Sequence, residues 1–340
     1  MKNILSIDGG GIYGFVPLAV CIEIEKELNR RGFATRDGNP AELSDVFDIF
    51  YCTSTGAIII GVALAGINED GAPRVRGFNA QKVKDLYSTL GPIIFGEQTG
   101  AISIGGIPIN GPKFDGVELE NSLALLGRRP LSRFSIPNLN AQNKPLDVAI
   151  SAFNLSTGKP QFFRSWINGA ANGDIDVIDA ILASSFAPLF FPLKEINRQF
   201  YSDGGIFAVN PALFALTDTL KRFPGETINV VSLGTGEFPG AFEPATEADV
   251  DVFFWASRVS RIIQDGQISS SDEQLQTIAA GLPNVNYFRF DVILDQPKRS
   301  DETDPVILNS AANKMTAEIS TSRGTQRAEF ERMINSIINT

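Results

Sequence analysis

The residue types that could carry chemistry here are a serine, an aspartate and a run of glycines, each following an apolar segment. Ser54 lies in residues 52–56 (CTSTG), between a β-rich apolar run and an apolar helical pattern. A nucleophile elbow places serine between a strand and a helix and requires small residues two positions to either side. Gly56 meets this requirement fully and Cys52 less well. The alternative is that Ser54 or Thr55 only caps the helix.

Residues 8–14 (DGGGIYG) follow the first apolar run. Successive glycines let backbone N–H groups converge into an anion-binding concavity, which could hold an oxyanion. Gly9, Gly11 and Gly14 also satisfy the dinucleotide fingerprint, but that motif needs a second strand ending in an acidic residue about 20 positions later. No Gly-Lys-Ser/Thr follows, so a P-loop is excluded. A sugar-kinase-like ATPase needs a hairpin strand where residues 15–28 favour a helix, and a plain tight turn remains open.

Asp203 is followed by Gly204 and Gly205 between two apolar runs. Asp-Gly is a strong signal for a hairpin turn. The functional alternative is a carboxylate held close to a nucleophile on a tight turn.

The sequence has no histidine. A Ser-His-Asp triad is therefore excluded, and a serine hydrolase built from this chain needs a carboxylate as its base. Burial would have to raise the pKa of that aspartate, so we expect the rate to rise through one raised carboxyl pKa and stay flat through pH 8. Zinc sites that need a His ligand are excluded too, and Cys21 and Cys52 are too few for a four-cysteine site. Two cysteines indicate a reducing compartment, so we expect a cytoplasmic protein.

Composition narrows the classes of partner. The 340 residues are 43% hydrophobic and 20% charged, with a formal net charge of −10. No basic run replaces phosphate counterions, so nucleic-acid polymers are excluded as main partners. The same acidity argues against purely electrostatic docking on an anionic membrane. The N-terminus does not read as a signal peptide, and no apolar run reaches the length of a spanning helix.

Strand and helix patterns alternate along the chain. The strands are expected at residues 3–7, 46–51, 146–153, 161–166, 228–233 and 286–292, and the helices at 15–28, 57–65, 79–90, 117–126, 176–184, 309–318 and 326–338. This alternation predicts a mostly parallel sheet covered by helices on both faces, in one domain spanning 1–340. Residues 91–116 lack a helical period and predict a long connection, either covering the core or acting as a lid that meets lipid.

The three motifs, in this order, resemble the patatin-like phospholipase family. Its glycine-rich motif, its elbow and its later Asp-Gly-Gly match residues 8–14, 52–56 and 203–205, and segments 113–119, 183–188 and 232–236 are also similar. The resemblance implies an α/β fold, a three-layer α/β/α sandwich. It further implies a Ser54–Asp203 dyad, oxyanion donors at Gly9, Gly10 and Gly11, and motif-supporting residues Asp8, Gly14, Gly56, Gly204 and Gly205.

The activity implied by the resemblance is hydrolysis of fatty-acyl esters of membrane glycerolipids, of phospholipase A or lysophospholipase type, through an acyl-enzyme. No metal or organic cofactor is expected. Tyr13 stands where the family usually has Arg or Lys, and Cys52 replaces the elbow's first glycine. These departures suggest the alternative of a catalytically decayed lipid-binding or scaffolding protein, with a nucleotide-binding ATPase as a weaker one. The expected partner is lipid at the bilayer surface; an activating small molecule or protein, and a homo-oligomer, remain open.

Overall fold

The computed structural model describes residues 1–35, 38–65, 77–96, 98–104, 107–108, 110–134, 146–169, 172–238, 254–255 and 258–338. Within these residues a central sheet of eight strands has the order β10-β9-β1-β2-β5-β8-β7, with β6 also paired to β5. Its strands are β1 (Lys2–Ile7), β2 (Ile49–Cys52), β5 (Asp147–Asn154), β6 (Lys159–Arg164), β7 (Lys194–Ile196), β8 (Gln199–Asp203), β9 (Ile228–Leu233) and β10 (Val285–Phe290). A separate pair is formed by β3 (Ser103–Ile104) and β4 (Ile107–Pro108).

The sheet combines two kinds of pairing. Strands β10, β9, β1, β2 and β5 run parallel, which confirms the prediction from the alternating pattern. Strands β6 and β8 pair antiparallel to β5, and β7 pairs antiparallel to β8. Strand β8, which ends at Asp203, therefore runs opposite to the parallel strands. The sequence pattern did not reveal this direction.

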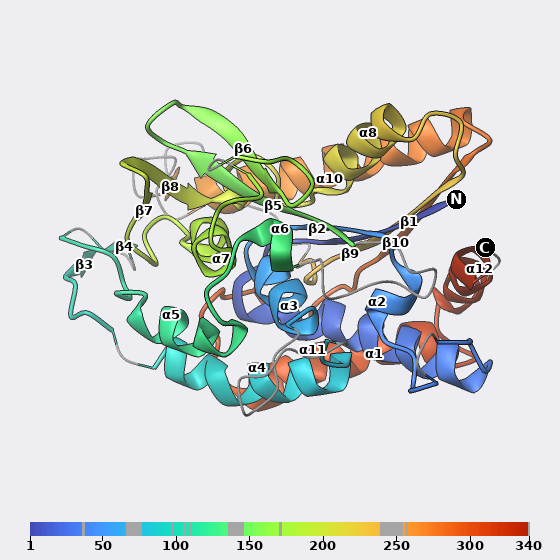
Figure 1. Cartoon of the computed structure of the whole chain (residues 1–340). Coiled ribbons are helices and arrows are strands. Elements are labelled where there is room, and N and C mark those ends of the chain that lie inside the picture. Colours follow the sequence, from blue (N-terminus) through green and yellow to red (C-terminus); the bar gives the residue numbers. More distant parts are fainter. Residues whose placement is uncertain are drawn as a thin grey trace.

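Helices cover both faces of the sheet (Figure 1), so the predicted three-layer α/β/α arrangement is confirmed. Helices α8 and α10 lie on one face, and α1, α3, α4 and α11 lie on the other. The α-helices are α1 (Phe15–Arg30), α2 (Leu43–Val46), α3 (Thr55–Ala63), α4 (Ala80–Ile94), α5 (Val117–Leu123), α6 (Leu131–Phe134), α7 (Val177–Ser185), α8 (Ala212–Arg222), α10 (Val259–Gly281), α11 (Pro305–Ser320) and α12 (Arg327–Ile338). Short 3-10 turns are η1 (Gly11–Gly14), η2 (Ala124–Leu126) and η3 (Gly204–Ile206).

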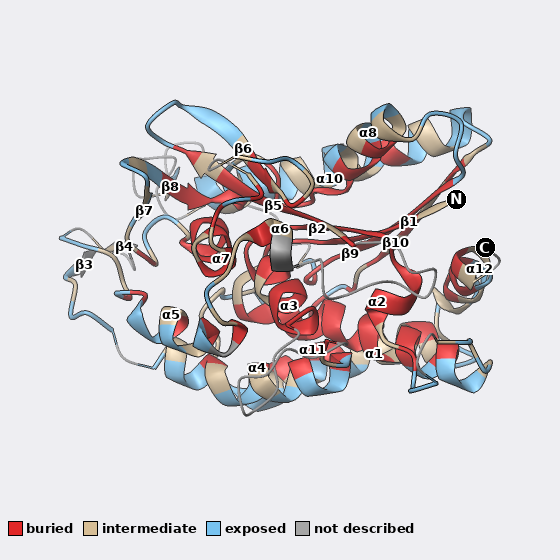
Figure 2. Ribbon diagram, in the orientation of Figure 1, coloured by how far each residue is buried: buried red, intermediate tan, exposed pale blue. Residues whose placement is uncertain are grey.

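The central strands are mostly apolar, as expected for parallel strands with both faces buried. In β2, Phe50 and Cys52 join the larger hydrophobic cluster, beneath α1, α3 and α7, while Ile49 and Tyr51 join the cluster beneath α8 and α10. Figure 2 shows the parallel central strands mostly buried and the outer faces of α4 and α8 exposed. Because these strands run parallel, the turns that follow them lie at the same edge of the sheet.

The segment 91–116 differs from its prediction. Helix α4 continues through Pro92 to Ile94 instead of ending near residue 90. The Phe95 ring packs against the rings of Phe114 and Phe191, with centroids 5.4 and 6.1 Å apart, so this side chain covers the core. Residues 97, 105–106 and 109 of the segment lie outside the described part of the chain.

Helix α10 has no counterpart among the predicted helices, and α8 was not predicted either. None of the described helices has both the length and the apolar character that crossing a membrane requires.

Candidate active site

Ser54 occupies a strained turn between β2 and α3. Its backbone has φ 53° and ψ −119°, a left-handed conformation that residues with a Cβ rarely adopt. The Ser54 N–H donates to Oγ of Ser184 at 2.9 Å, and Oγ of Ser185 donates to the Ser54 carbonyl at 3.2 Å. Two hydroxyls at the end of α7 therefore hold both backbone groups of Ser54. The alternative that Ser54 only caps the helix does not explain the strained backbone conformation.

The residues two positions from Ser54 meet the demands of an elbow in different ways. A Cβ added at Gly56 would lie 2.4 Å from the carbonyl oxygen of Ile7, so α3 approaches β1 too closely for any side chain. Cys52 ends β2 with its thiol fully buried, donating to the Ala149 carbonyl at 3.4 Å. Burial raises the pKa of this thiol well above its usual range. The core thus accommodates Cys52 at the position where the family usually has glycine.

The register of the sheet brings Asp203 level with Ser54. Cys52 of β2 pairs with Ile150 of β5, and Ala152, two residues further along β5, pairs with Asp203 of β8. Ser54 is likewise two residues beyond Cys52. Strand β8 runs antiparallel to β5 and ends at Asp203, the residue that pairs with Ala152. The turn that follows is η3, so the alternative of a simple hairpin turn at Asp203 is wrong.

The Asp203 side chain is buried close to the nucleophile candidate. One carboxylate oxygen accepts the Gly205 N–H at 2.6 Å. Burial raises the pKa of Asp203 to about 6, while the Ser54 side chain and the Gly205 N–H oppose the shift. Gly204 is required because a Cβ there would lie 2.0 Å from Oγ of Ser151. A carboxylate with such a pKa is a competent base near neutral pH.

The glycine loop lies directly beside Ser54. A Cβ added at Gly9 would lie 3.3 Å from the Cβ of Ser54. The Gly9 N–H, expected to be an oxyanion donor, donates to the Val209 carbonyl at 2.9 Å in this structure. Among the residues described, no acceptor is found for the N–H groups of Gly10 and Gly11. Two of the three expected donors therefore remain available.

Asp8, at the end of β1, belongs to a buried ion-pair group. Its carboxylate lies 2.7 Å from the Arg289 guanidinium, which is also 2.8 Å from Asp291. Burial raises the pKa of Asp8 to about 7, while the positive charge of Arg289 opposes the shift. The structure thus gives Asp8 a partner in β10.

Tyr13 and Gly14 end the glycine loop. Tyr13 is buried, and the ammonium of Lys298 lies 5.7 Å from the centroid of its ring. A Cβ on Gly14 would lie 2.7 Å from Oγ1 of Thr55 and 2.9 Å from the ring of Tyr87. The family usually has Arg or Lys at position 13. In this chain Tyr13 stands there, and the cation that lies over its ring comes from Lys298, in a distant segment.

Four residues near the site were missed as contributors by the sequence analysis. Ser184 and Ser185 lie in a segment that resembles the family, but their bonds to Ser54 depend on how α7 packs. Thr235 lies in another such segment and donates to the Gly9 carbonyl at 2.9 Å. Lys298 follows β10 and carries no motif that could have revealed it.

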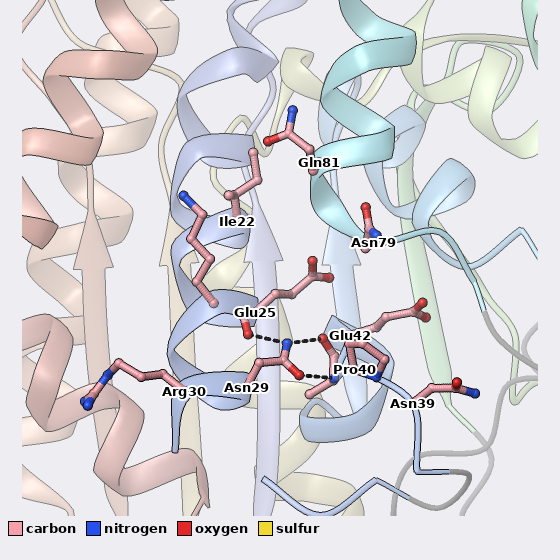
Figure 3. Close-up of a pocket in the computed structure, with 11 residues that line it drawn as sticks. Ile22, Glu25, Asn29, Arg30, Asn39, Pro40, Glu42, Asn79 and Gln81 are labelled. Atoms are coloured by element: carbon pink, nitrogen blue, oxygen red, sulfur yellow. Dashed lines mark hydrogen bonds between the residues drawn. The ribbon is translucent and has the colours of Figure 1, made fainter. Parts of the chain in front are cut away.

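A hollow in the described part of the chain lies away from this site. It has a volume of about 810 Å³ and lies along α1, between the loop before α2 and the start of α4. Figure 3 shows Glu25 and Asn29 among its lining residues, with neither Ser54 nor Asp203. The Glu25 carboxylate accepts the N–H groups of Leu43 and Ala80 at 3.2 and 2.9 Å, which fits a structural role at the starts of α2 and α4. No cluster of potential metal ligands is found among the described residues.

Sequence comparison relates the chain to plant proteins. The profile of the patatin-like phospholipase family matches residues 5–216, a range that includes the glycine loop, Ser54 and Asp203. Patatin-like protein 2 of Arabidopsis thaliana is 32% identical over 252 residues, covering 70% of this chain and 55% of that protein. Patatin group J-1 of Solanum tuberosum is 26% identical over 317 residues, covering 85% and 76% respectively. The chain thus spans about half the length of the first of these relatives and three quarters of the second.

Among solved structures, VipD from Legionella pneumophila matches 98% of this chain and 67% of its own, with a TM-score of 0.44 and 13% identity. The type III effector protein ExoU matches all of this chain and 54% of its own, with a TM-score of 0.34 and 11% identity.

Proposed function

Because this chain belongs to the patatin-like phospholipase family, we propose that it is a lipid acyl hydrolase that uses Ser54 as nucleophile and Asp203 as base. The observation that supports this most is that the sheet register places the buried Asp203 level with the strained Ser54, beside two backbone N–H groups that have no acceptor among the described residues. Nucleophile, base and oxyanion donors are the three parts that acyl transfer through a serine requires.

In the proposed reaction, Asp203 takes the Ser54 proton as the hydroxyl oxygen attacks the acyl carbonyl. The N–H groups of Gly10 and Gly11 stabilise the tetrahedral oxyanion, as does the N-terminal end of α3. The proton then passes from Asp203 to the departing alcohol of the lipid. Water, deprotonated by the same carboxylate, releases the fatty acid from the acyl-enzyme. No step needs an imidazole, and the sequence contains none.

We propose that the substrates are fatty-acyl esters of membrane glycerolipids, cleaved as by a phospholipase A or lysophospholipase. The whole of 1–340 would act as one catalytic unit that binds the bilayer surface peripherally. Because the net charge is −10, affinity for that surface has to come from apolar side chains more than from charge.

Release of fatty acid from phosphatidylcholine vesicles tests the proposal. Ser54→Ala and Asp203→Asn should each lower the rate at least about 1,000-fold, because each removes one member of a unit that acts together. Ser88→Ala is the matched control, since that exposed hydroxyl bonds only to the Lys84 carbonyl of its own helix and should leave the rate unchanged.

A fluorophosphonate probe adds a test that does not depend on the lipid chosen. We expect the probe to label the peptide containing Ser54 in the wild type and not in Ser54→Ala. A folded wild-type protein that binds vesicles, hydrolyses no lipid and takes no label would instead support a non-catalytic lipid-binding protein. Thermal stabilisation by nucleotide without labelling would support the ATPase alternative.

A further inference from the structure

The peptide groups of the glycine loop are fixed through their carbonyl oxygens. The Gly9 carbonyl and the Gly10 N–H belong to one peptide group, and the described chain has no cis bond. In a planar trans peptide the oxygen and the hydrogen point in opposite directions. Whatever holds the Gly9 carbonyl on one side of the loop therefore sets the direction of the Gly10 N–H on the other.

Two side chains from distant segments hold that carbonyl. Oγ1 of Thr235 donates to the Gly9 carbonyl at 2.9 Å, and the Lys298 ammonium donates to Oγ1 of Thr235 at 2.5 Å. An ammonium has donors and no acceptor, so the Thr235 hydroxyl must turn its own proton toward Gly9. The chain of donors runs one way, from Lys298 through Thr235 to the Gly9–Gly10 peptide.

The fit around Gly10 is too tight for this arrangement to be incidental. A Cβ added at Gly10 would lie 2.2 Å from Oγ1 of Thr235 and 2.6 Å from Nζ of Lys298. Thr235 is 2% exposed. The next peptide group is also held, because Tyr13 N–H donates to the Gly10 carbonyl at 3.4 Å. Both N–H groups left without an acceptor thus belong to peptides with a fixed carbonyl.

We infer that Lys298 and Thr235 are positioning residues for the oxyanion hole: their directed hydrogen bonds orient the Gly9–Gly10 peptide and polarise the Gly10 N–H toward the reacting acyl group. The inference rests on the proposed function. A hydrogen bond given to a carbonyl draws electron density from the same peptide's N–H, which becomes a stronger donor. Neither residue needs to contact the substrate.

The charge of Lys298 is sensitive to its surroundings. The charged groups that face it are Asp291 after β10, Asp8 after β1, and Asp265 and Arg261 of α10. Burial lowers the pKa of Lys298 to about 8 in spite of the three carboxylates. A neutral amine can accept a hydrogen bond, so above that pH the Thr235 hydroxyl is free to turn away from Gly9. The rate should then fall with a midpoint near pH 8, rather than stay flat as the absence of histidine alone predicts.

Hydrolysis of a short soluble ester, measured from pH 5 to pH 10, tests the inference without the influence of membrane binding. Thr235→Val keeps the shape of the side chain and removes the hydroxyl. We expect kcat to fall roughly 10- to 100-fold, with KM little changed. This fall is smaller than the effect of removing a whole oxyanion-hole donor, because the Gly10 N–H itself remains. Thr235→Ser should restore most of kcat. Lys314→Met is the control, because Lys314 of α11 pairs with Asp295 and not with Thr235.

Variants of Lys298 test the positioning role through the pH profile of the rate, which would not change if Lys298 only stabilised the fold. Lys298→Met should lower kcat by a similar factor and abolish the alkaline fall. Lys298→Arg keeps the charge over the whole range, so its rate should not fall near pH 8. Fluorophosphonate labelling of Ser54 in every variant shows that the nucleophile is intact.

The outcomes separate the two proposals. A wild-type kcat and an unchanged pH profile in both Thr235→Val and Lys298→Met would overturn the positioning role while leaving the hydrolase intact. A wild type that neither hydrolyses ester nor takes the probe would overturn the proposed function itself. If Thr235→Val fails to fold, Thr235→Ser and Lys298→Arg still decide, since the first must retain activity and the second must lose the alkaline fall.

Discussion

The Ser54 N–H group donates to Oγ of Ser184 across the gap between two helices, at 2.9 Å. This bond and the one from Ser185 hold Ser54 at φ 53°. A backbone held in this region costs about 1–3 kcal/mol when a Cβ is present. The strain is therefore located at the residue proposed to react.

Ser54→Gly should stabilise the fold while removing activity. Glycine relieves the strain but adds flexibility to the unfolded chain, so we expect a net gain of about 1 kcal/mol. Ser54→Ala keeps the Cβ and should gain nothing, which makes it the matched control. Urea denaturation measures both. A Ser54→Gly protein less stable than Ser54→Ala would show that the turn is not strained.

Asp203→Asn should also stabilise the fold at pH 7. The folded-state pKa of about 6 lies above the value of 3.8 for a free carboxyl, so the folded state binds more protons between about pH 4 and pH 6. Wild-type stability therefore falls as the pH rises through this window, and the asparagine variant avoids that loss. We expect a gain on the order of 2 kcal/mol at pH 7 that disappears at pH 4. Equal stability of the two proteins at both pH values would contradict the burial of an ionised Asp203.

The rate of ester hydrolysis should rise with pH through an apparent pKa of about 6. Only the ionised Asp203 can accept the Ser54 proton, and burial raises its pKa to that value. Initial rates between pH 4.5 and 7.5 measure the rise, and circular dichroism at each pH checks that the protein stays folded. A rate that is already maximal at pH 4.5 would mean that another group acts as base.

Gly10→Ala should cost catalysis more than stability. The added Cβ would meet Thr235 at 2.2 Å and Lys298 at 2.6 Å, so these side chains must move and the Gly10 N–H must turn with its peptide. We expect kcat to fall roughly 100- to 1,000-fold. Gly266→Ala is the control, because a Cβ there meets nothing within 4 Å and should stabilise α10 by up to about 1 kcal/mol. An unchanged rate with a lower melting temperature in Gly10→Ala would favour a turn without catalytic use.

Ile93→Ser and Phe95→Ser should separate the two interpretations of the segment after α4. The partly buried Phe95 ring packs against the core, so its loss should lower stability by about 2 kcal/mol and reduce all activities together. Ile93 is 47% exposed, so Ile93→Ser should leave the fold and the hydrolysis of a soluble ester unchanged. A strong loss of vesicle hydrolysis in Ile93→Ser alone would identify Ile93 as a lipid contact.

The sequence was sufficient to predict the parts of the fold whose signals are local. Residues 3–7 and 228–233 are apolar runs of strand length, and both are strands of the parallel sheet. Asn79 was predicted to cap a helix, and its side chain accepts the Lys82 N–H at 2.9 Å. The strand, turn and helix around Ser54 were also predicted, because they follow one another directly in the chain.

Features that depend on long-range packing could not be predicted. Gly9 was expected to donate to an oxyanion, but Val209, brought beside it by the fold, takes its N–H. The antiparallel entry of β8 depends on its register with β5, which no local pattern encodes. Lys298 is one lysine in a polar stretch, and only the packing of that stretch against Thr235 shows what it touches.

The first strand of the chain lies inside the sheet, between β2 and the much later β9. During synthesis, β1 and the Ser54 turn leave the ribosome long before Val209, Thr235 and Lys298, whose contacts complete the glycine loop. Pairings between such distant segments form late in folding. A nascent chain would therefore carry the proposed nucleophile without a finished site to use it until the last third of the protein had been made.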